Sequence, residues 1–297
     1  MPSVTRLKSN GIEIEYETFG DPGALPLLLI GGLGSQLLSW EEAFCEQLRD
    51  RGFHVIRYDN RDAGLSTKME AAGEPDLMSA FTGNPNPAYH LDDLADDAVG
   101  VLDALDIGAA HVVGVSMGGF IAQLVAIKHP DRVLSLTSIM SGPGGHDGVA
   151  PKPEGAEVLT RVPPETREGR LEHGIWFRKV LKGSADPFDE EAEMKRVVRS
   201  YDRSYYPVGT GRQLVAILAA EGRLERLSKL KVPTLVVHGT DDVLVPVENG
   251  RSVAAAVPGA HLLEIEGMGH NLPERVWPQV MDAIEELARQ ATPLQPR

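Results

Sequence analysis

Short apolar runs alternate with amphipathic stretches along most of the chain, and this alternation constrains the fold more than any other feature. Apolar runs bounded by turn residues are typical of strands buried on both faces, and the amphipathic stretches between them are typical of crossover helices. The pattern therefore predicts an α/β fold with a mostly parallel sheet covered by helices on both faces. We expect strands at residues 11–18, 26–30, 53–58, 110–115, 133–140, 234–238 and 261–265.

The clearest expected helix spans residues 91–105, where apolar residues recur every three or four positions. Its opposite side carries aspartates at positions 92, 93, 96, 97 and 103. Such a run of charge is typical of a solvated helix face, and we interpret it that way rather than as a metal site. Further helices are expected near residues 120–128, 165–181, 190–201 and 274–289.

The alternation stops between residues 143 and 210, a stretch rich in proline, glycine and charge. We expect this stretch to form a helical cap domain inserted into a core domain made of residues 1–142 and 211–297. Ligands of such folds bind at the carboxyl edge of the sheet, which a cap would cover. Four aromatic residues of the insertion are therefore expected to bind substrate, unless they only pack its own small core: Trp176, Phe177, Tyr205 and Tyr206.

Charge and cysteine content exclude several classes of function. The chain of 297 residues has 29 Lys and Arg against 43 Asp and Glu, a net charge of −14, so its field repels nucleic acid and anionic lipid. The single cysteine, Cys45, excludes an internal disulfide and any cysteine-based metal cluster. With neither a leader-like apolar segment nor a run long enough to span a bilayer, we expect a cytoplasmic protein without membrane or nucleic-acid partners.

The sharpest motif is Gly114-Val115-Ser116-Met117-Gly118, which follows the expected strand 110–115 and precedes an expected helix. A G-x-S-x-G pattern in this context indicates a tight turn that lifts the serine hydroxyl clear of the sheet. Glycines two residues to either side avoid a clash within that turn. Ser116 is therefore the candidate nucleophile.

A serine hydroxyl becomes a good nucleophile only when a base takes its proton and a carboxylate orients that base. His270 follows the last expected strand, and both Asp241 and Asp242 follow the strand before it. These residues would meet Ser116 at one edge of a parallel sheet, in the chain order Ser, Asp, His. The remaining histidines lie outside such a context.

Several segments together resemble the α/β-hydrolase superfamily, and within it carboxylesterases and the aclacinomycin methylesterase-like group. The resemblance runs nearly end to end and implies an eight-stranded, mostly parallel sheet with a helical cap. Within it Asp242, three residues after a glycine, corresponds to the acid, and Ser116 and His270 to nucleophile and base. The matching segments are GGLGSQLLSW (31–40), RYDNRDAGLS (57–66), YHLDDLADDAVGVLDALDI (89–107), VVGVSMGGFIAQLVAIKHPDRV (112–133), PTLVVHGTDDVLVP (233–246) and GMGHNLP (267–273).

The resemblance also implies an oxyanion hole formed by the backbone amides of Leu33 and Met117. Here the loop of Leu33 begins with Gly31-Gly32, where many relatives have His-Gly. The loop that carries Arg61 and Asp62 is expected to hold a structural ion pair beneath the nucleophile, and residues 69–87 to form a long surface loop.

The function expected from these features is a cofactor-free and metal-free serine carboxylesterase. It would act through an acyl-enzyme on a small to medium, largely apolar ester, as a monomer or a homodimer. The alternatives are a methylesterase or lactonase of a secondary metabolite, and a receptor of the same fold that binds a ligand without turnover.

Overall fold

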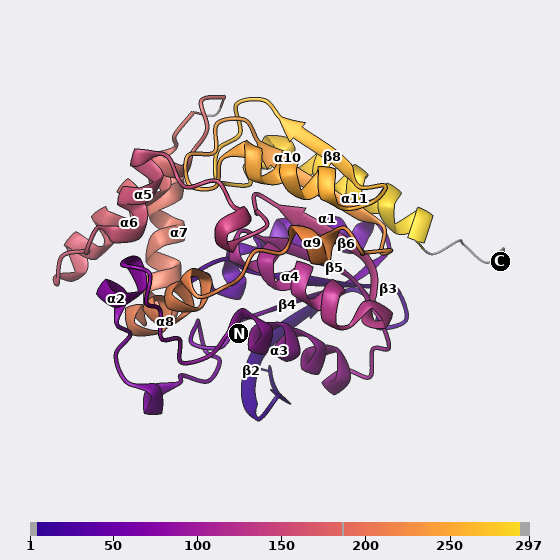
Figure 1. Ribbon diagram of the computed structural model, residues 1–297, viewed down its shortest axis with the longest axis horizontal. Coiled ribbons are helices and arrows are strands. Elements are labelled where there is room, and N and C mark those ends of the chain that lie inside the picture. The colour runs from indigo at the N-terminus through magenta and orange to yellow at the C-terminus, as the bar shows by residue number, and fades with distance from the viewer. Residues whose placement is uncertain (1–4, 186, 292–297) are drawn as a thin grey trace.

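The computed structural model describes residues 5–185 and 187–291, and an eight-stranded sheet forms its centre (Figure 1). The strand order is β1-β2-β4-β3-β5-β6-β7-β8; pairs that include β1 or β2 are antiparallel and all others are parallel. This sheet confirms the fold class predicted from the sequence. The strands are β1 (Thr5–Ser9), β2 (Ile12–Phe19), β3 (Leu25–Ile30), β4 (Phe53–Tyr58), β5 (Ala110–Val115), β6 (Val133–Ile139), β7 (Thr234–Gly239) and β8 (His261–Ile265).

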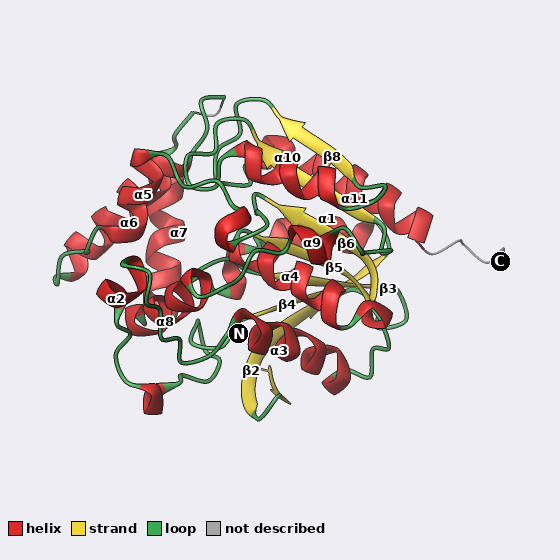
Figure 2. Cartoon of the chain, in the orientation of Figure 1, coloured by secondary structure: helices red, strands yellow, loops and turns green. Residues whose placement is uncertain are grey.

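Helices cover both faces of the sheet, as Figure 2 shows. Alternate side chains of β3 enter two separate cores, because successive strand residues point to opposite faces. One core includes Leu28 with residues of α3 (Leu91–Ala104), α4 (Met117–Lys128) and α10 (Val247–Ala256). The other includes Leu29 with residues of α1 (Glu42–Asp50) and α11 (Trp277–Ala291). The short helices η1 (Leu37–Ser39), η3 (Pro130–Arg132), α9 (Leu224–Leu227) and η5 (Glu274–Val276) complete this part of the chain.

The hairpin of β1 and β2 supplies the strand that apolar patterning did not predict. β1 is a short edge strand with the sequence TRLKS, and its exposed side leaves it little apolar signal. The turn that joins it to β2 is Asn10-Gly11, with both residues at positive φ (47° and 81°). Asn-Gly is a strong hairpin signal in a sequence, and it would have predicted this strand.

Between β6 and β7 the chain forms a group of helices that lies to one side of the sheet in Figure 1. They are α5 (Pro153–Thr160), α6 (Arg167–Leu181), α7 (Glu190–Arg203) and α8 (Pro207–Leu218), whereas η4 (Gly145–Asp147) lies beside α9, where Asp147 accepts a hydrogen bond from the Leu224 amide (2.9 Å). The insertion expected from the sequence is therefore helical. The domain division stays a prediction: its boundary at residue 210 falls within α8, and its outer ends, residues 1 and 297, lie outside the described residues.

Residues 69–87 are not the plain surface loop expected from the sequence. They contain η2 (Glu70–Ala72) and α2 (Leu77–Phe81), which packs on α8. Asp76 caps α2, since its side chain accepts a hydrogen bond from the Ser79 amide (3.0 Å). A helix of five residues leaves too little periodicity to be recognised among the surrounding turn residues.

The prediction that the aspartates of α3 form a solvated face was wrong for Asp97, whose side chain is buried. Its carboxylate pairs with Arg61, with Nε and Oδ2 2.6 Å apart. Asp62 pairs instead with Arg212 of α8 (2.9 Å) and accepts a hydrogen bond from the Tyr89 hydroxyl (2.8 Å). The expected structural role of Arg61 and Asp62 therefore takes the form of two buried ion pairs, each with a partner from elsewhere in the chain.

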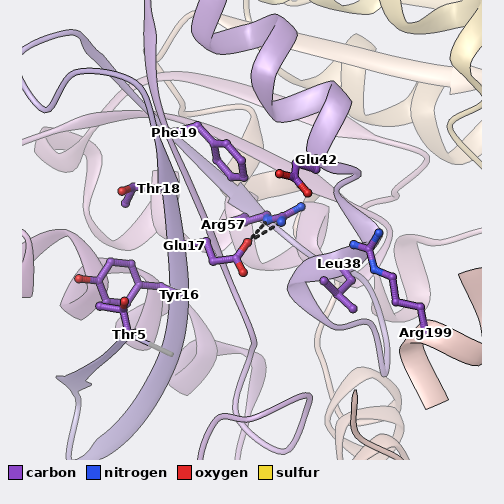
Figure 3. A pocket seen from close by; sticks show the side chains of 9 residues that line it. All are labelled: Thr5, Tyr16, Glu17, Thr18, Phe19, Leu38, Glu42, Arg57 and Arg199. Carbon is purple, nitrogen blue, oxygen red and sulfur yellow. Dashed lines mark hydrogen bonds and ion pairs between the residues drawn. The ribbon is translucent and has the colours of Figure 1, made fainter. Parts of the chain in front are cut away.

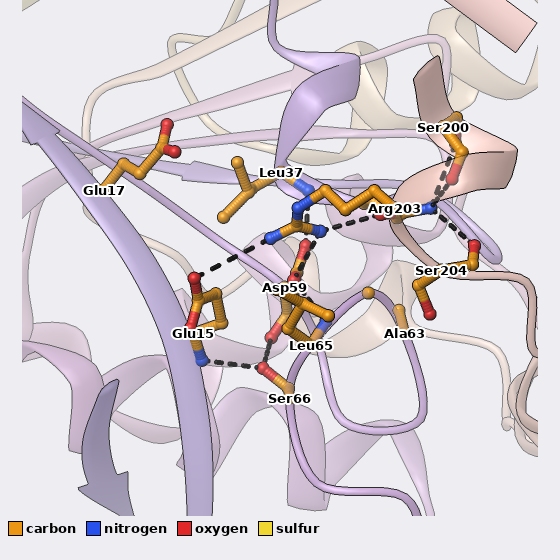
Figure 4. A network of polar contacts seen from close by, with 12 residues as sticks. Glu15, Glu17, Leu37, Asp59, Ala63, Leu65, Ser66, Ser200, Arg203 and Ser204 are labelled. Atoms are coloured by element: carbon orange, nitrogen blue, oxygen red, sulfur yellow. Dashed lines mark hydrogen bonds and ion pairs between the residues drawn. The ribbon is translucent and has the colours of Figure 1, made fainter. Parts of the chain in front are cut away.

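A buried polar network joins α7 to the core (Figure 4). The Arg203 guanidinium lies 2.9 Å from Asp59, whose carboxylate also accepts hydrogen bonds from the amides of Leu37 and Leu65. Arg203 also donates to the Gln36 side chain (2.7 Å). This network fixes the end of α7 against the loop that follows β3.

Candidate active site

Ser116 lies at the turn between β5 and α4, in a strained backbone conformation with φ 57° and ψ −121°. A Cβ atom on Gly114 would lie 2.0 Å from the Gly118 carbonyl oxygen, and one on Gly118 would lie 2.1 Å from the Ile30 carbonyl oxygen. Only glycine fits at either position. These contacts explain why the turn needs the G-x-S-x-G pattern and how it presents the serine hydroxyl beyond the end of β5.

The structure brings His270 and Asp242 to Ser116. The Nε2 atom of His270 lies 2.9 Å from Ser116 Oγ, and its Nδ1 atom lies 2.7 Å from Asp242 Oδ2. Because an ionised carboxylate only accepts hydrogen bonds, Nδ1 carries the proton and donates it to Asp242. The neutral ring then leaves its Nε2 lone pair free to accept the Ser116 hydroxyl proton.

Asp242 is fully buried in the turn after β7. Its Oδ1 atom accepts hydrogen bonds from the amides of Leu244 (2.9 Å) and Val245 (2.8 Å). Burial alone would raise the pKa of this carboxyl, but the positive charge that His270 carries when protonated, together with hydrogen bonds from His238, His270 and the Val245 amide, holds the pKa well below its usual range. The carboxylate therefore stays ionised and keeps the His270 ring in one tautomer.

Asp241, the other candidate acid, faces a different partner. Its Oδ2 atom accepts a hydrogen bond from the Ser184 amide (2.9 Å), and hydrogen bonds from the Ser184 side chain and amide hold the pKa of Asp241 below its usual value. Of the two neighbouring aspartates, the geometry brings only Asp242 to His270.

The amides of Leu33 and Met117, which the sequence predicts to form an oxyanion hole, both belong to segments beside Ser116, and their role stays a prediction. Met117 begins α4, where the first amides of a helix have no partner within the helix. A Cβ atom on Gly32 would lie 3.3 Å from Ser116 Cβ, so the loop of Leu33 runs beside the nucleophile. Among the described residues, neither the Leu33 nor the Met117 amide donates a hydrogen bond to another protein group.

The segment after α6 contacts the loop that carries His270, a feature that sequence analysis missed. The His270 amide donates to the Leu181 carbonyl oxygen (2.8 Å), and the Ala185 amide donates to the Gly267 carbonyl oxygen (3.1 Å). A Cβ atom on Gly183 would lie 1.9 Å from that same Gly267 oxygen. The only sequence signal for this close packing is the pair of glycine-containing segments, 183 and 267–269, which lie far apart in the chain.

Three of the four aromatic residues expected to bind substrate make contacts with cations. Arg161 stacks on the ring of Trp176 (4.3 Å to its centroid) and Arg170 on that of Tyr205 (4.6 Å). The Tyr206 hydroxyl lies 3.4 Å from the Arg212 guanidinium, and Phe177 is exposed. These contacts fit the alternative, packing within the insertion and against the core, and substrate binding by the four stays a prediction.

A cavity of about 600 Å³ lies elsewhere, between β2, β4, α1 and α7 (Figure 3). The ion pair of Glu17 with Arg57 lines it, together with Arg199. Its lining includes none of the three residues that meet at Ser116. Within residues 5–185 and 187–291, no group of three His, Cys, Asp or Glu side chains could hold a metal ion, and no helix is both long and apolar enough to cross a membrane.

Residues 26–274 match the family model of the alpha/beta hydrolase fold. The chain therefore belongs to the alpha/beta hydrolase family, which confirms the resemblance seen in the sequence.

Three known proteins illustrate the relationship. The chain is 32% identical to rhodomycin D methylesterase DnrP of Streptomyces peucetius, in an alignment that covers 97% of this chain and 99% of that protein. It is 33% identical to rhodomycin D methylesterase DauP of Streptomyces sp. (strain C5), covering 93% of this chain and 95% of the relative. Among solved structures it is similar to a thermophilic esterase from Thermogutta terrifontis, with a TM-score of 0.74, 26% identity and coverage of 97% and 99% of the two chains.

Proposed function

We propose that the protein is a serine esterase that hydrolyses a carboxylic methyl ester of a secondary metabolite. The observation that carries the proposal is the hydrogen-bonded series from Ser116 Oγ through His270 to Asp242. The similarity to two methylesterases over nearly the whole chain supports a methyl ester as substrate. This proposal narrows the general carboxylesterase expected from the sequence to one of its alternatives.

In the proposed reaction His270 Nε2 takes the hydroxyl proton while Ser116 Oγ attacks the ester carbonyl. The amides of Leu33 and Met117 donate to the oxyanion that forms. Collapse of this tetrahedral intermediate breaks the bond to the methoxy group, which leaves as methanol with the proton from His270. The acyl group stays on Ser116 until a water molecule, deprotonated by His270, attacks it and releases the carboxylic acid.

The test is a panel of esters that share one acyl group and differ in the alcohol: methyl, ethyl and butyl. Release of alcohol and acid is measured for the wild type and for Ser116→Ala, and labelling by a fluorophosphonate probe is measured in parallel. We expect turnover that is fastest with the methyl ester and lost in Ser116→Ala, with one label per chain on Ser116.

Asp241→Asn is the matched control for the choice of acid, because an asparagine still accepts the hydrogen bond from the Ser184 amide. We expect this variant to keep activity within a few-fold of the wild type. Stoichiometric labelling without turnover of any ester would favour the ligand-binding receptor instead. Hydrolysis of lactones in preference to every methyl ester would favour the lactonase.

A further inference from the structure

A tight turn carries the Leu33 amide past the nucleophile. The Ser35 amide donates to the Gly32 carbonyl oxygen (3.2 Å), and Gly34 has a φ of +64°. A positive φ in the third position is the conformation that a type II turn requires, which explains a glycine there. The turn of residues 32–35 therefore has one defined form in this structure.

Two of the amides in this turn are already engaged. The Ser35 amide closes the turn, and the Gly34 amide donates to the side-chain oxygen of Gln213 (2.8 Å). The Leu33 amide, next to Gly32 and hence next to Ser116, is left for a substrate oxygen. The choice of amide in the oxyanion hole thus depends on where the Gly34 amide is directed.

Gln213 is well placed to control that direction. It lies in α8 with its side chain fully buried, and its Nε2 atom donates to the Arg61 carbonyl oxygen (2.7 Å). Both ends of the side-chain amide are bonded, so the oxygen cannot rotate away from the Gly34 amide without losing two hydrogen bonds. On the same helix, Thr210 lies against Gly34: a Cβ atom on Gly34 would lie 2.7 Å from Thr210 Oγ1.

We propose that Gln213 is a positioning residue of the oxyanion hole. It holds the Gly34 amide away from the substrate and fixes the turn of residues 32–35 in the form that presents the Leu33 amide beside Ser116. This inference rests on the proposed function, and it assigns a part in the proposed reaction to a residue of α8, outside the core sheet. Without Gln213 the part-buried Gly34 amide lacks an acceptor, and the peptide between Leu33 and Gly34 rotates to find another.

The test is Gln213→Met, which keeps the length of the side chain and removes both hydrogen bonds. The readouts are kcat and KM for the preferred ester, and the affinity for a boronic acid whose tetrahedral adduct places an oxygen in the oxyanion hole. The matched control is Gln123→Met: Gln123 is also fully buried, donates to Ser138 Oγ (3.1 Å) and accepts from Arg223 (3.2 Å), but does not bond to this turn.

We expect Gln213→Met to lower kcat by ~10- to 100-fold, less than the ~10²–10³-fold that follows removal of a whole oxyanion donor. KM should change little, and boronic acid affinity should fall with kcat, because the turn acts on the tetrahedral state. Gln123→Met should keep kcat within a few-fold. If Gln213→Met does not fold, Gln213→Asn, whose shorter side chain cannot reach both partners, is expected to show the same loss.

Equal losses of kcat in the Gln213 and Gln123 variants would overturn the inference, as would a change in KM alone. The proposed function fails separately, if the wild type neither turns over an ester nor reacts with the fluorophosphonate.

Discussion

Buried His111 should make the protein less stable in mild acid. Its ring lies in β5, only 1% exposed, with Nδ1 2.8 Å from Ser135 Oγ and with Nε2 lacking a hydrogen-bond partner among the described residues. Burial lowers the pKa of His111 from 6.5 to about 4, because the charged ring would lose its hydration. Between these two pH values the unfolded chain binds a proton that the folded chain does not, so the free energy of unfolding falls as the pH falls.

The size of this change in the free energy of unfolding follows from the pKa of His111 in the unfolded and in the folded chain. With 6.5 for the unfolded chain and about 4 for the folded chain, this one group lowers the free energy of unfolding by about 2 kcal/mol at pH 5 relative to pH 7. In His111→Asn the amide still reaches Ser135 but does not titrate. The variant should therefore gain about 2 kcal/mol relative to the wild type between pH 7 and pH 5.

Urea unfolding followed by tryptophan fluorescence measures this difference, since Trp40 and Trp277 are both buried in the core. Measurements at pH 7, 6 and 5 on both proteins separate His111 from every other titrating group, which the two proteins share. The control is His146→Asn, because the side chain of His146 is 87% exposed and stays hydrated in both states. A stability difference between wild type and His111→Asn that is the same at all three pH values would refute the reasoning.

Three further predictions concern activity and the contacts that the helices of the insertion make with the rest of the chain. Asp242→Asn should lower kcat by ~10⁴-fold in steady-state kinetics, because an asparagine amide favours the wrong tautomer of His270. A loss below tenfold would contradict the proposed role of Asp242 as the acid that orients His270. Gly183→Ala should lower kcat/KM by ~10- to 100-fold, because the added Cβ would displace the loop of His270; unchanged kinetics would show that the loop tolerates it. Arg203→Met should lower the free energy of unfolding by about 2 to 3 kcal/mol, measured by urea titration, because the buried Asp59 carboxylate loses its ion-pair partner. This loss is smaller than the ~3–5 kcal/mol expected for a fully buried pair, since the Arg203 side chain is 17% exposed. A loss under ~0.5 kcal/mol, the usual size for a surface substitution, would contradict the prediction.

The parts of the fold and site that the sequence predicted are those encoded by local pattern. The strands from 53–58 and 110–115 agree with the structure because their apolar runs are bounded by turn residues on both sides. Ser116 and His270 were placed at one sheet edge from the order of strands and loops alone, and the structure brings them within 2.9 Å.

What sequence reasoning missed depends on partners that lie far away in the chain. The sequence of α3 gives no sign that Asp97 is buried, because its partner Arg61 lies 36 residues earlier. In the same way, Gln213 is an unremarkable residue of α8 until its contact with Gly34, 179 residues away, is known. Side chains that bridge distant segments leave no periodic signal in the sequence. Gln213, which contacts the loop beside Ser116, is such a side chain.

The bridging contacts that reach the loops around Ser116 come from the insertion and from the helix α8 that ends it. Gln213 bonds to the turn of Leu33, and the Leu181 carbonyl oxygen accepts the His270 amide. Arg203 meets Asp59, which in turn binds the amide of Leu37 at the end of the same loop. Both the turn of Leu33 and the loop of His270 thus contact helices outside the core sheet. An insertion that only covered the site could be lost without changing it, whereas here its loss would remove the Gln213 bond to the turn of Leu33 and the Leu181 bond to the loop of His270.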